Sequence, residues 1–326
     1  MDAFGFALGL GIRASVVLGV TALALLALRR ASAATRQSVA VAGMAGALAL
    51  LPLTFALPHL DLVVFPAAAT EATAAPAHDA LSRFLLAGWV ALAWGAVAAL
   101  SLARLVFGMW RVARCARRGR RTELDGACVA RAAGKLGLRR PVRVVLSGEV
   151  KVPMTAGFFS SVVILPAHAA NWSSERLELV LLHELAHVKR RDCLAVMVAE
   201  IAVASWWFHP LAWLARRSIR RDAELAADDL VLRTGARASV YAEHLVSIVR
   251  SVRDSSGFDP AMTMGRSSDL DGRLRALLER RGRGPSSRWG RGVAAALAIL
   301  ALALATVRPT RAAEPPPTCQ RSRHAR

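Results

Sequence analysis

The sequence lacks the cysteine pattern of a disulfide-stabilised protein. It has four cysteines and no Cys-x-x-Cys pair; they are Cys115, Cys128, Cys193 and Cys319. The first three fall in the part of the chain that we expect to be cytoplasmic, where thiols stay reduced. We therefore expect ordinary thiols and no disulfide framework.

The chain also lacks any nucleic-acid-binding motif, although its formal net charge is +20. No recognition-helix pattern and no interleaving of aromatic with basic residues accompanies this charge. Most of the Lys and Arg residues instead stand beside long apolar runs, where anionic lipid headgroups attract them. The positive charge therefore indicates contact with membrane lipid and argues against direct nucleic-acid binding.

Long apolar runs set the class of the protein. Hydrophobic residues make up 55% of the chain and the mean hydropathy is +0.39, which is too apolar for an ordinary soluble protein. Four runs have the length of about 20 residues that crosses a bilayer as a helix: 5–28, 37–57, 84–107 and 291–307. The pair Arg29 and Arg30 follows the first run instead of preceding it, so we interpret that run as an uncleaved helix and not as a signal peptide.

The distribution of basic residues predicts the orientation in the membrane. The loop from Pro58 to Ser82 contains no Lys or Arg, whereas arginines cluster between the first two runs, after the third and before the fourth. Basic residues stay on the cytoplasmic side, so we expect a multi-pass protein of the cell membrane. Its predicted parts are three membrane helices in 1–107, a cytoplasmic domain 108–290, a fourth membrane helix 291–308 and a flexible outer tail 309–326.

The most informative motif is the pentad HELAH, which runs from His183 through Glu184 to His187. Residues four apart share one face of a helix, so both imidazoles can bind one metal ion while Glu184 points at its open position. A lone helical histidine is usually an ordinary surface or core residue, but chance matches to the whole pentad are rare. The pentad therefore predicts a zinc hydrolase site.

A catalytic zinc takes a third protein ligand and leaves its fourth position to water. Two carboxylates compete for that place. Glu224 lies in a helical stretch with Asp228 one turn on, where Asp228 can accept the second N–H of a ligand histidine. The alternative for Glu224 is a surface ion pair with Arg220 or Arg221, which would contribute little. Glu200 stands in an apolar run, where a buried carboxyl is the simpler interpretation. We favour Glu224 as the ligand.

The apolar run Cys193–Ala215 limits where that ligand can lie. The run is long enough to cross a membrane once and too short to cross twice. A single crossing would put Glu224 on the far side from His183 and His187, and basic residues flank the run at both ends. We therefore expect a helix that packs inside the catalytic domain or lies along the membrane surface, two positions that suit its tryptophans equally.

The rest of the cytoplasmic part predicts an α+β domain. Val142–Leu146 and Ser161–Leu165 are short β-branched runs bounded by Pro and Gly, with Thr155–Phe159 between them, and they indicate a small antiparallel sheet. Asn171 or Ser173 can cap the helix that carries the pentad. This is the layout of a minimal zinc peptidase, in which an exposed strand edge can pair with an extended substrate.

Three segments in this order resemble one known family. HELAH, WWFHPLAWLARR and RRDAELAADD are similar in order and spacing to motifs of the membrane zinc metallopeptidases of the beta-lactam-sensing receptor (BlaR/MecR) type. VPMTAGFFSSVVILP and SSDLDGRLRALL are similar to flanking segments of that family, and the resemblance covers residues 81–308. The sequence departs at Asp222, where the family often has Glu, and at Ser161, where it often has Pro. Only residues 308–326 follow Val307, in place of the receptors' penicillin-binding sensor, so we expect any sensor to be a separate protein.

The resemblance implies roles for single residues. It makes His183, His187 and Glu224 the ligands of Zn2+, Glu184 the general base, and Asp228 a partner of a ligand histidine. His209 in FHPLAW has the chemistry to stabilise an oxyanion, but the family also uses Asn there, which favours a structural role.

The expected protein is therefore an α+β, polytopic membrane protein with four membrane helices and a cytoplasmic, gluzincin-like HExxH metallopeptidase domain. We expect a zinc-dependent endopeptidase that cleaves a cytoplasmic regulator, by resemblance a winged-helix repressor, or itself, in a signalling pathway. Two alternatives are a housekeeping membrane protease that clears damaged proteins, and a non-catalytic membrane sensor or scaffold in which zinc is structural or absent.

Overall fold

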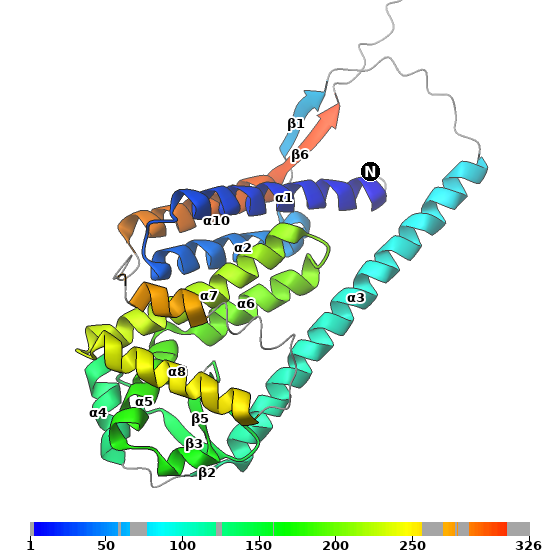
Figure 1. Ribbon diagram of the computed structural model, residues 1–326. Coiled ribbons are helices and arrows are strands. Elements are labelled where there is room, and N and C mark those ends of the chain that lie inside the picture. The colour runs from blue at the N-terminus through cyan, green and yellow to red at the C-terminus, as the bar shows by residue number, and fades with distance from the viewer. Residues whose placement is uncertain are drawn as a thin grey trace, which may run out of the picture.

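A computed structural model describes residues 3–57, 60–65, 77–121, 126–158, 160–255, 270–277, 279 and 287–311 (Figure 1). The protein is mostly helical with a small sheet. Four of the described helices are long and apolar enough to cross a membrane, as the four apolar runs predict. They are α1 (Ala3–Ala27), α2 (Ala33–Ala56), α3 (Ala77–Arg118) and α10 (Arg288–Thr306).

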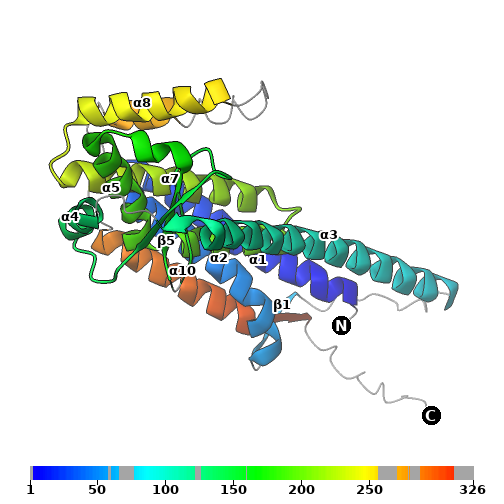
Figure 2. The same ribbon diagram turned by 90° about the horizontal axis from the view of Figure 1, so that it is seen from below.

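Helices α1, α2 and α10 form one bundle, whereas α3 extends away as a single long helix (Figures 1 and 2). The 42 residues of α3 span about 63 Å, roughly twice the hydrocarbon thickness of a bilayer. Many of its apolar side chains are exposed, among them Trp89. Trp94 ties α3 to the rest by donating from Nε1 to the carbonyl of Ser205 at 3.0 Å. The surface of α3 therefore suits contact with lipid.

The apolar run Cys193–Ala215 is a helical hairpin, so the expectation of one continuous helix is wrong. Helix α6 (Asp192–Ser205) ends before a turn, and α7 (Pro210–Arg233) runs back beside it (Figure 1). His209 is extended, with φ −94° and ψ 114°, because the residue before a proline avoids helical geometry while proline itself starts a helix readily. The hairpin shares its hydrophobic core with α1, α2 and α10.

The sheet is mixed, which corrects the prediction of an antiparallel sheet. Its strands, in spatial order, are β2 (Arg120–Arg121), β3 (Arg143–Ser147), β5 (Val162–Pro166) and β4 (Met154–Ala156). β4 pairs antiparallel with β5, but β3 pairs parallel with β5. Every residue of β5 is buried, and continuous apolar strands take such central places. The three-residue strand β4 is left at one edge.

Helix α5 (Ser174–Arg190), which carries the pentad, packs between the sheet and α7. Of the two predicted caps the structure uses Ser173, whose hydroxyl accepts from the backbone N–H of Arg176 at 3.3 Å. Leucines of α5 enter a core that also includes α4 (Gly126–Leu136) and α8 (Ala238–Ser255). The metal-site helix is therefore held by packing on several sides.

Two short strands pair in parallel at the far end of the bundle from the sheet (Figure 1). They are β1 (Leu60–Phe65) and β6 (Val307–Arg311), so the start of the predicted outer loop lies beside the start of the predicted tail. The tail 309–326 was expected to be flexible, but its first residues, up to Arg311, belong to β6. The rest of the tail lies outside the described residues, as does 66–76 of the outer loop.

Candidate metal centre

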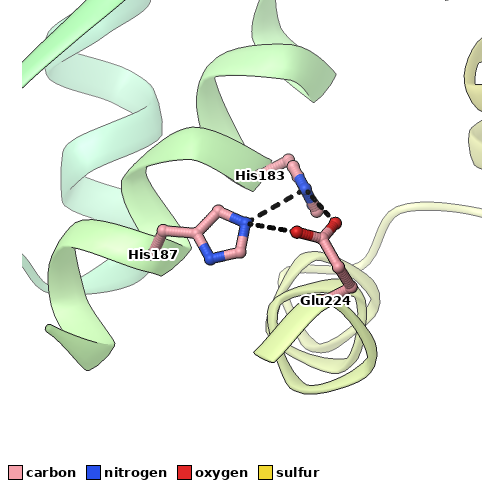
Figure 3. Close-up of side chains that lie close together, drawn as sticks. All are labelled: His183, His187 and Glu224. Carbon is pink, nitrogen blue, oxygen red and sulfur yellow. Dashed lines mark hydrogen bonds and ion pairs between the residues drawn. The ribbon is translucent and has the colours of Figure 1, made fainter. Parts of the chain in front are cut away.

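Three side chains from two helices converge between α5 and α7 (Figure 3). His183 and His187 lie one turn apart on α5, and Glu224 faces them from α7. The Nε2 atoms of the two histidines are 3.3 Å apart. The carboxylate oxygens of Glu224 lie 3.4 Å from Nε2 of His183 and 3.7 Å from Nε2 of His187. The structure thus brings together the three residues that the sequence analysis selects as ligands.

These separations suit a zinc ion. Two ligands held at about 2.0–2.1 Å from zinc with tetrahedral angles are themselves about 3.3 Å apart, close to the observed distances. Two imidazoles and one carboxylate are also the donor set of a catalytic zinc with one open position. The histidine side chains are 13% and 14% exposed and that of Glu224 is 38% exposed, so one side of the cluster faces solvent. The residues present therefore fit the metal.

The ring of His187 is oriented by Asp192, which the sequence analysis missed. Arg191 has a left-handed backbone, with φ 58°, and it turns the chain from α5 directly into α6. This places Oδ2 of Asp192 2.8 Å from Nδ1 of His187. Burial alone would raise the pKa of Asp192, but the hydrogen bond with His187 and the charge of Arg190 lower it below its usual value. A carboxylate only accepts, so Nδ1 carries the proton and the lone pair of Nε2 faces Glu224.

The ring of His183 is oriented in the same way by two residues. Its Nδ1 lies 3.3 Å from Oδ1 of Asp228 and 2.9 Å from the hydroxyl of Tyr241. The hydroxyl donates its one proton to Oδ1 of Asp228 at 2.7 Å, so it accepts from Nδ1 of His183. The lone pair of Nε2 is again left for a metal. Asp228 therefore lies where the sequence analysis expects it, whereas Tyr241, the single tyrosine of the chain, was missed.

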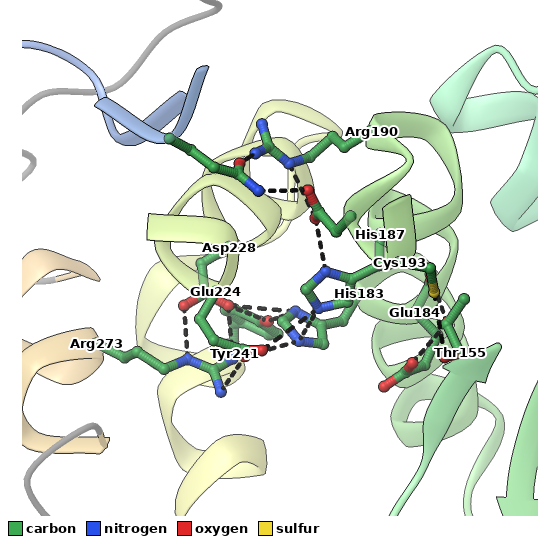
Figure 4. A network of polar contacts seen from close by, with 12 residues as sticks. Thr155, His183, Glu184, His187, Arg190, Cys193, Glu224, Asp228, Tyr241 and Arg273 are labelled. Carbon is green, nitrogen blue, oxygen red and sulfur yellow. Dashed lines mark hydrogen bonds and ion pairs between the residues drawn. The ribbon is translucent and has the colours of Figure 1, made fainter. Parts of the chain in front are cut away.

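Arg273, from the helical segment 270–277, connects two of the carboxylates (Figure 4). Its guanidinium reaches Oε2 of Glu224 at 2.9 Å and both oxygens of Asp228 at 2.7 and 2.8 Å. Burial alone would raise the pKa of Asp228, but the charge of Arg273 and the hydrogen bond with His183 hold it well below its usual range. The segment SSDLDGRLRALL, selected only for its family resemblance, thus contributes a residue to the site.

The carboxylates of Asp228 and Glu224 also change the pKa of the nearest imidazole, that of His183. Burial lowers the pKa of His183, but hydrogen bonds with Asp228 and Glu224 raise it more, to about 10. A site that favours a protonated imidazole this strongly has a negative potential, and such a potential also attracts a metal cation. The electrostatics of the cluster therefore agree with its donor set.

Glu184 lies on the side of α5 that faces the sheet, and it is buried, with 7% of its surface exposed. The hydroxyl of Thr155 on the edge strand β4 lies 2.7 Å from Oε2 of Glu184 and 3.0 Å from its backbone oxygen. Sγ of Cys193 in turn lies 3.6 Å from the carbonyl of Thr155. The carboxylate in the middle of the pentad is therefore attached to the edge of the sheet (Figure 4).

Two other candidates from the sequence lie away from the cluster: Glu200, which competed for the place of the third ligand, and His209, which has the chemistry to stabilise an oxyanion. Glu200 accepts from Arg216 at 2.7 Å and from Arg220 at 2.6 Å, so the surface pair considered for Glu224 belongs instead to Glu200. His209 precedes α7, and its Nε2 lies 3.0 Å from Oγ of Ser15 on α1. Fifteen helical positions separate it from Glu224, about 22 Å along the axis. His209 is thus too far from the cluster to stabilise an oxyanion there, and its contact with Ser15 agrees with the structural role that the sequence favours.

Comparison with known families identifies the chain. The family model described as "BlaR1 peptidase M56" matches residues 15–277, which is most of the sequence. This chain belongs to the BlaR1 peptidase M56 family. Peptidases of the M56 family are membrane-associated metallopeptidases, and the cluster of two histidines and one glutamate is a possible metal site of this member. The resemblance to BlaR/MecR-type proteins is confirmed.

Individual relatives match a shorter stretch of this M56 chain. "Regulatory protein BlaR1" of Bacillus licheniformis is 34% identical over 94 residues, 28% of this chain and 16% of the relative. "Regulatory protein BlaR1" of Staphylococcus aureus is 28% identical over 106 residues, 32% and 18% of the two chains. "Methicillin resistance mecR1 protein" of S. aureus strain Mu50 is 25% identical over 96 residues, 29% and 16%. The matched stretch is less than a fifth of each relative.

The hydroxyl of Tyr241 provides a test of how the site is organised. In Tyr241→Phe the ring stays and only the contact with His183 and Asp228 is removed, so we expect zinc affinity to fall about 10-fold or more, as for other residues that orient a metal ligand. Competition with a chromophoric chelator would measure this. Ser247→Ala, which removes a hydroxyl bonded within the same helix α8, should leave the affinity unchanged. Equal affinity in Tyr241→Phe and wild type would show that this hydroxyl does not orient His183.

Proposed function

We propose that this protein is a membrane-embedded zinc endopeptidase in which His183, His187 and Glu224 hold zinc and Glu184 is the general base. The convergence of two Nε2 atoms and one carboxylate, at separations that suit tetrahedral zinc, carries the proposal. The M56 family supports it, because its members are metallopeptidases.

The residues of the chain have distinct tasks in this reaction. When bound, zinc would supply a Lewis acid that polarises the scissile carbonyl and makes water more acidic. Glu184, steadied by Thr155, takes a proton from water and gives it to the departing amine. Asp192 and Asp228 keep the two histidine rings in the orientation that presents Nε2.

The edge strand β4 provides a place for an extended substrate. β4 pairs with β5 on one side and lies at the end of the described sheet, so the main chain of a substrate can add to its other side. Thr155 lies on this strand and also contacts Glu184. A peptide paired with β4 would therefore pass close to the general base.

The substrate we propose is a cytoplasmic regulator such as a winged-helix repressor, or the protein itself. Two relatives are named regulatory proteins and others methicillin resistance proteins, which supports a role in signalling. The arginine clusters favour a cytoplasmic site in a multi-pass cell-membrane protein. The α6–α7 hairpin packs against the candidate membrane helices α1, α2 and α10, which supports a site close to the membrane surface.

The proposal is tested with the full chain in lipid nanodiscs. We expect it to cut a repressor encoded by a neighbouring gene at one site, to lose this activity with 1,10-phenanthroline, and to regain it with added zinc. An unfolded, unrelated protein is the parallel substrate. Cleavage of the unfolded protein alone would favour a housekeeping protease, and stoichiometric zinc without cleavage of either substrate would favour a sensor or scaffold.

A further inference from the structure

The first turns of membrane helix α2 carry two adjacent polar residues that face the metal centre. Arg36, which is partly buried, and Gln37, which is buried, stand between Thr35 and Ser38 near the start of a mostly apolar helix. Gln37 is 5% exposed and its partner Asp192 is 4% exposed. The carboxylate that Arg36 contacts, Asp222, is fully buried. Buried polar groups of this kind are costly unless they are paired, and here Gln37 pairs with Asp192 at the start of α6 and Arg36 with Asp222 on α7, the helix of Glu224.

Gln37 contacts the residue that orients His187. Its Nε2 donates to Oδ1 of Asp192 at 2.9 Å, and the other oxygen of Asp192, Oδ2, accepts from Nδ1 of His187 at 2.8 Å. The side-chain oxygen Oε1 of Gln37 accepts a hydrogen bond from Arg190. One carboxylate therefore lies between the amide of α2 and the imidazole of α5. Nε of Arg190 also donates to Oδ2, at 3.2 Å, so among the described contacts Gln37 alone holds Oδ1.

Arg36 holds the same turn of α2 against the second ligand helix. Its Nε lies 3.2 and 3.3 Å from the two oxygens of Asp222, and a terminal nitrogen donates to Oδ1 at 2.6 Å. Asp222 is on α7, two positions before Glu224. Its other hydrogen-bond partner, Ser218, belongs to the same helix. The ion pair between Arg36 and Asp222 thus holds the start of α2 in place, and this keeps Gln37 at a set distance from the junction of α5 and α6.

We propose that Gln37 is a positioning residue for the metal ligand His187 and acts through Asp192. This inference rests on the proposed metal site. With its amide in place, one oxygen of Asp192 is occupied and the other is aimed at His187. Without it, the carboxylate is held only through Oδ2, by His187 and Arg190, and the orientation of the imidazole is less firmly fixed. Because Gln37 belongs to a helix that spans the membrane, a shift of α2 relative to α5 would change metal binding.

The test is a double-mutant cycle on zinc affinity in the full chain. Gln37→Met keeps the length of the side chain and removes both hydrogen bonds, and we expect zinc to bind about 10–100-fold more weakly, as when other partners of a ligand histidine are lost. Asp192→Asn should weaken binding at least as much. If Gln37 acts through Asp192, the double variant should bind zinc no more weakly than Asp192→Asn alone. The visible spectrum of the Co2+ form should also change in Gln37→Met.

Ser38→Ala is the matched control, because the hydroxyl of this next residue bonds to the carbonyl of Ala34 within α2 and not to the site. Should Gln37→Met fail to fold, Gln37→Glu keeps the size and the acceptor for Arg190 but loses the donor to Asp192. Unchanged zinc affinity and Co2+ spectrum in the folded Gln37 variant would overturn the inference. The inference would also be overturned if the losses of zinc affinity caused by the Gln37 and Asp192 substitutions were fully additive in the double variant. Absence of zinc from the wild-type protein would instead overturn the proposed function.

Discussion

Glu184→Gln is expected to lower the rate of peptide cleavage by about 10²–10⁴-fold, the usual contribution of a general base. The amide cannot take a proton from water, whereas its carbonyl oxygen can still accept the hydrogen bond from Thr155. Initial rates on a fluorogenic peptide or on the identified substrate, compared at saturating concentration, would measure the loss in kcat. Zinc content and thermal stability should stay at wild-type values, because Glu184 is not among the three clustered side chains that could hold a metal ion.

The chain offers a matched control for this substitution. Glu178→Gln makes the same change on the same helix at a residue that pairs with Lys135 at 2.6 Å outside the site, and it should leave the rate unchanged. A rate equal to wild type in Glu184→Gln, with every substrate that the wild type cleaves, would remove Glu184 from the mechanism. If the wild type and Glu184→Gln were both inactive on every substrate, this result would support a sensor or scaffold.

His187→Ala is expected to abolish stoichiometric zinc binding and all peptidase activity. The substitution removes one of three ligands, and a site with two protein ligands falls short of the three that catalytic zinc takes. Metal analysis after dialysis should change from about one zinc per chain to a trace. Asp192 would lose a hydrogen-bond partner in a buried place, which costs about 1–3 kcal/mol and should also lower the melting temperature.

His168→Ala serves as the control for this variant. His168 is an exposed histidine whose ring packs against Trp172, outside the metal cluster, so its loss should change neither zinc content nor activity. Stoichiometric zinc in dialysed His187→Ala would mean that the ligand set is wrong. Glu224→Gln would then show whether zinc is held by that carboxylate at all.

Patterns of short range were readable from the sequence. The pentad places His183 and His187 on one helical face because 3.6 residues make a turn, and the apolar runs predict the membrane helices because a helix of about 20 residues satisfies its own backbone hydrogen bonds across the lipid. The sequence also favours Glu224 over Glu200. Its sharpest unused signal was His209-Pro210, because the residue before a proline resists helical geometry and the α6–α7 turn lies there.

Contacts between distant segments were decided by the tertiary structure. Tyr241 and Arg273 have ordinary sequence surroundings, and only packing brings Tyr241 to His183 and Arg273 to Glu224 and Asp228. The same holds for β5, which lies between β3 and β4 so that its buried backbone is hydrogen-bonded along both edges. Gln37 is 155 positions from Asp192, and no local pattern encodes that pair.

The amino-acid sequence by itself determined the membrane class, the family and the pentad, because these depend on composition and on spacings within one or two helical turns. The tertiary structure brings Glu224, which the sequence favours, to the two histidines, and it adds Asp192 and Tyr241 to the predicted Asp228 as residues that contact the imidazoles. The physical reason is the hairpin: α7 can bring Glu224 to α5 only after the chain reverses at Pro210. The direction of that return is set by packing against α1, α2 and α10.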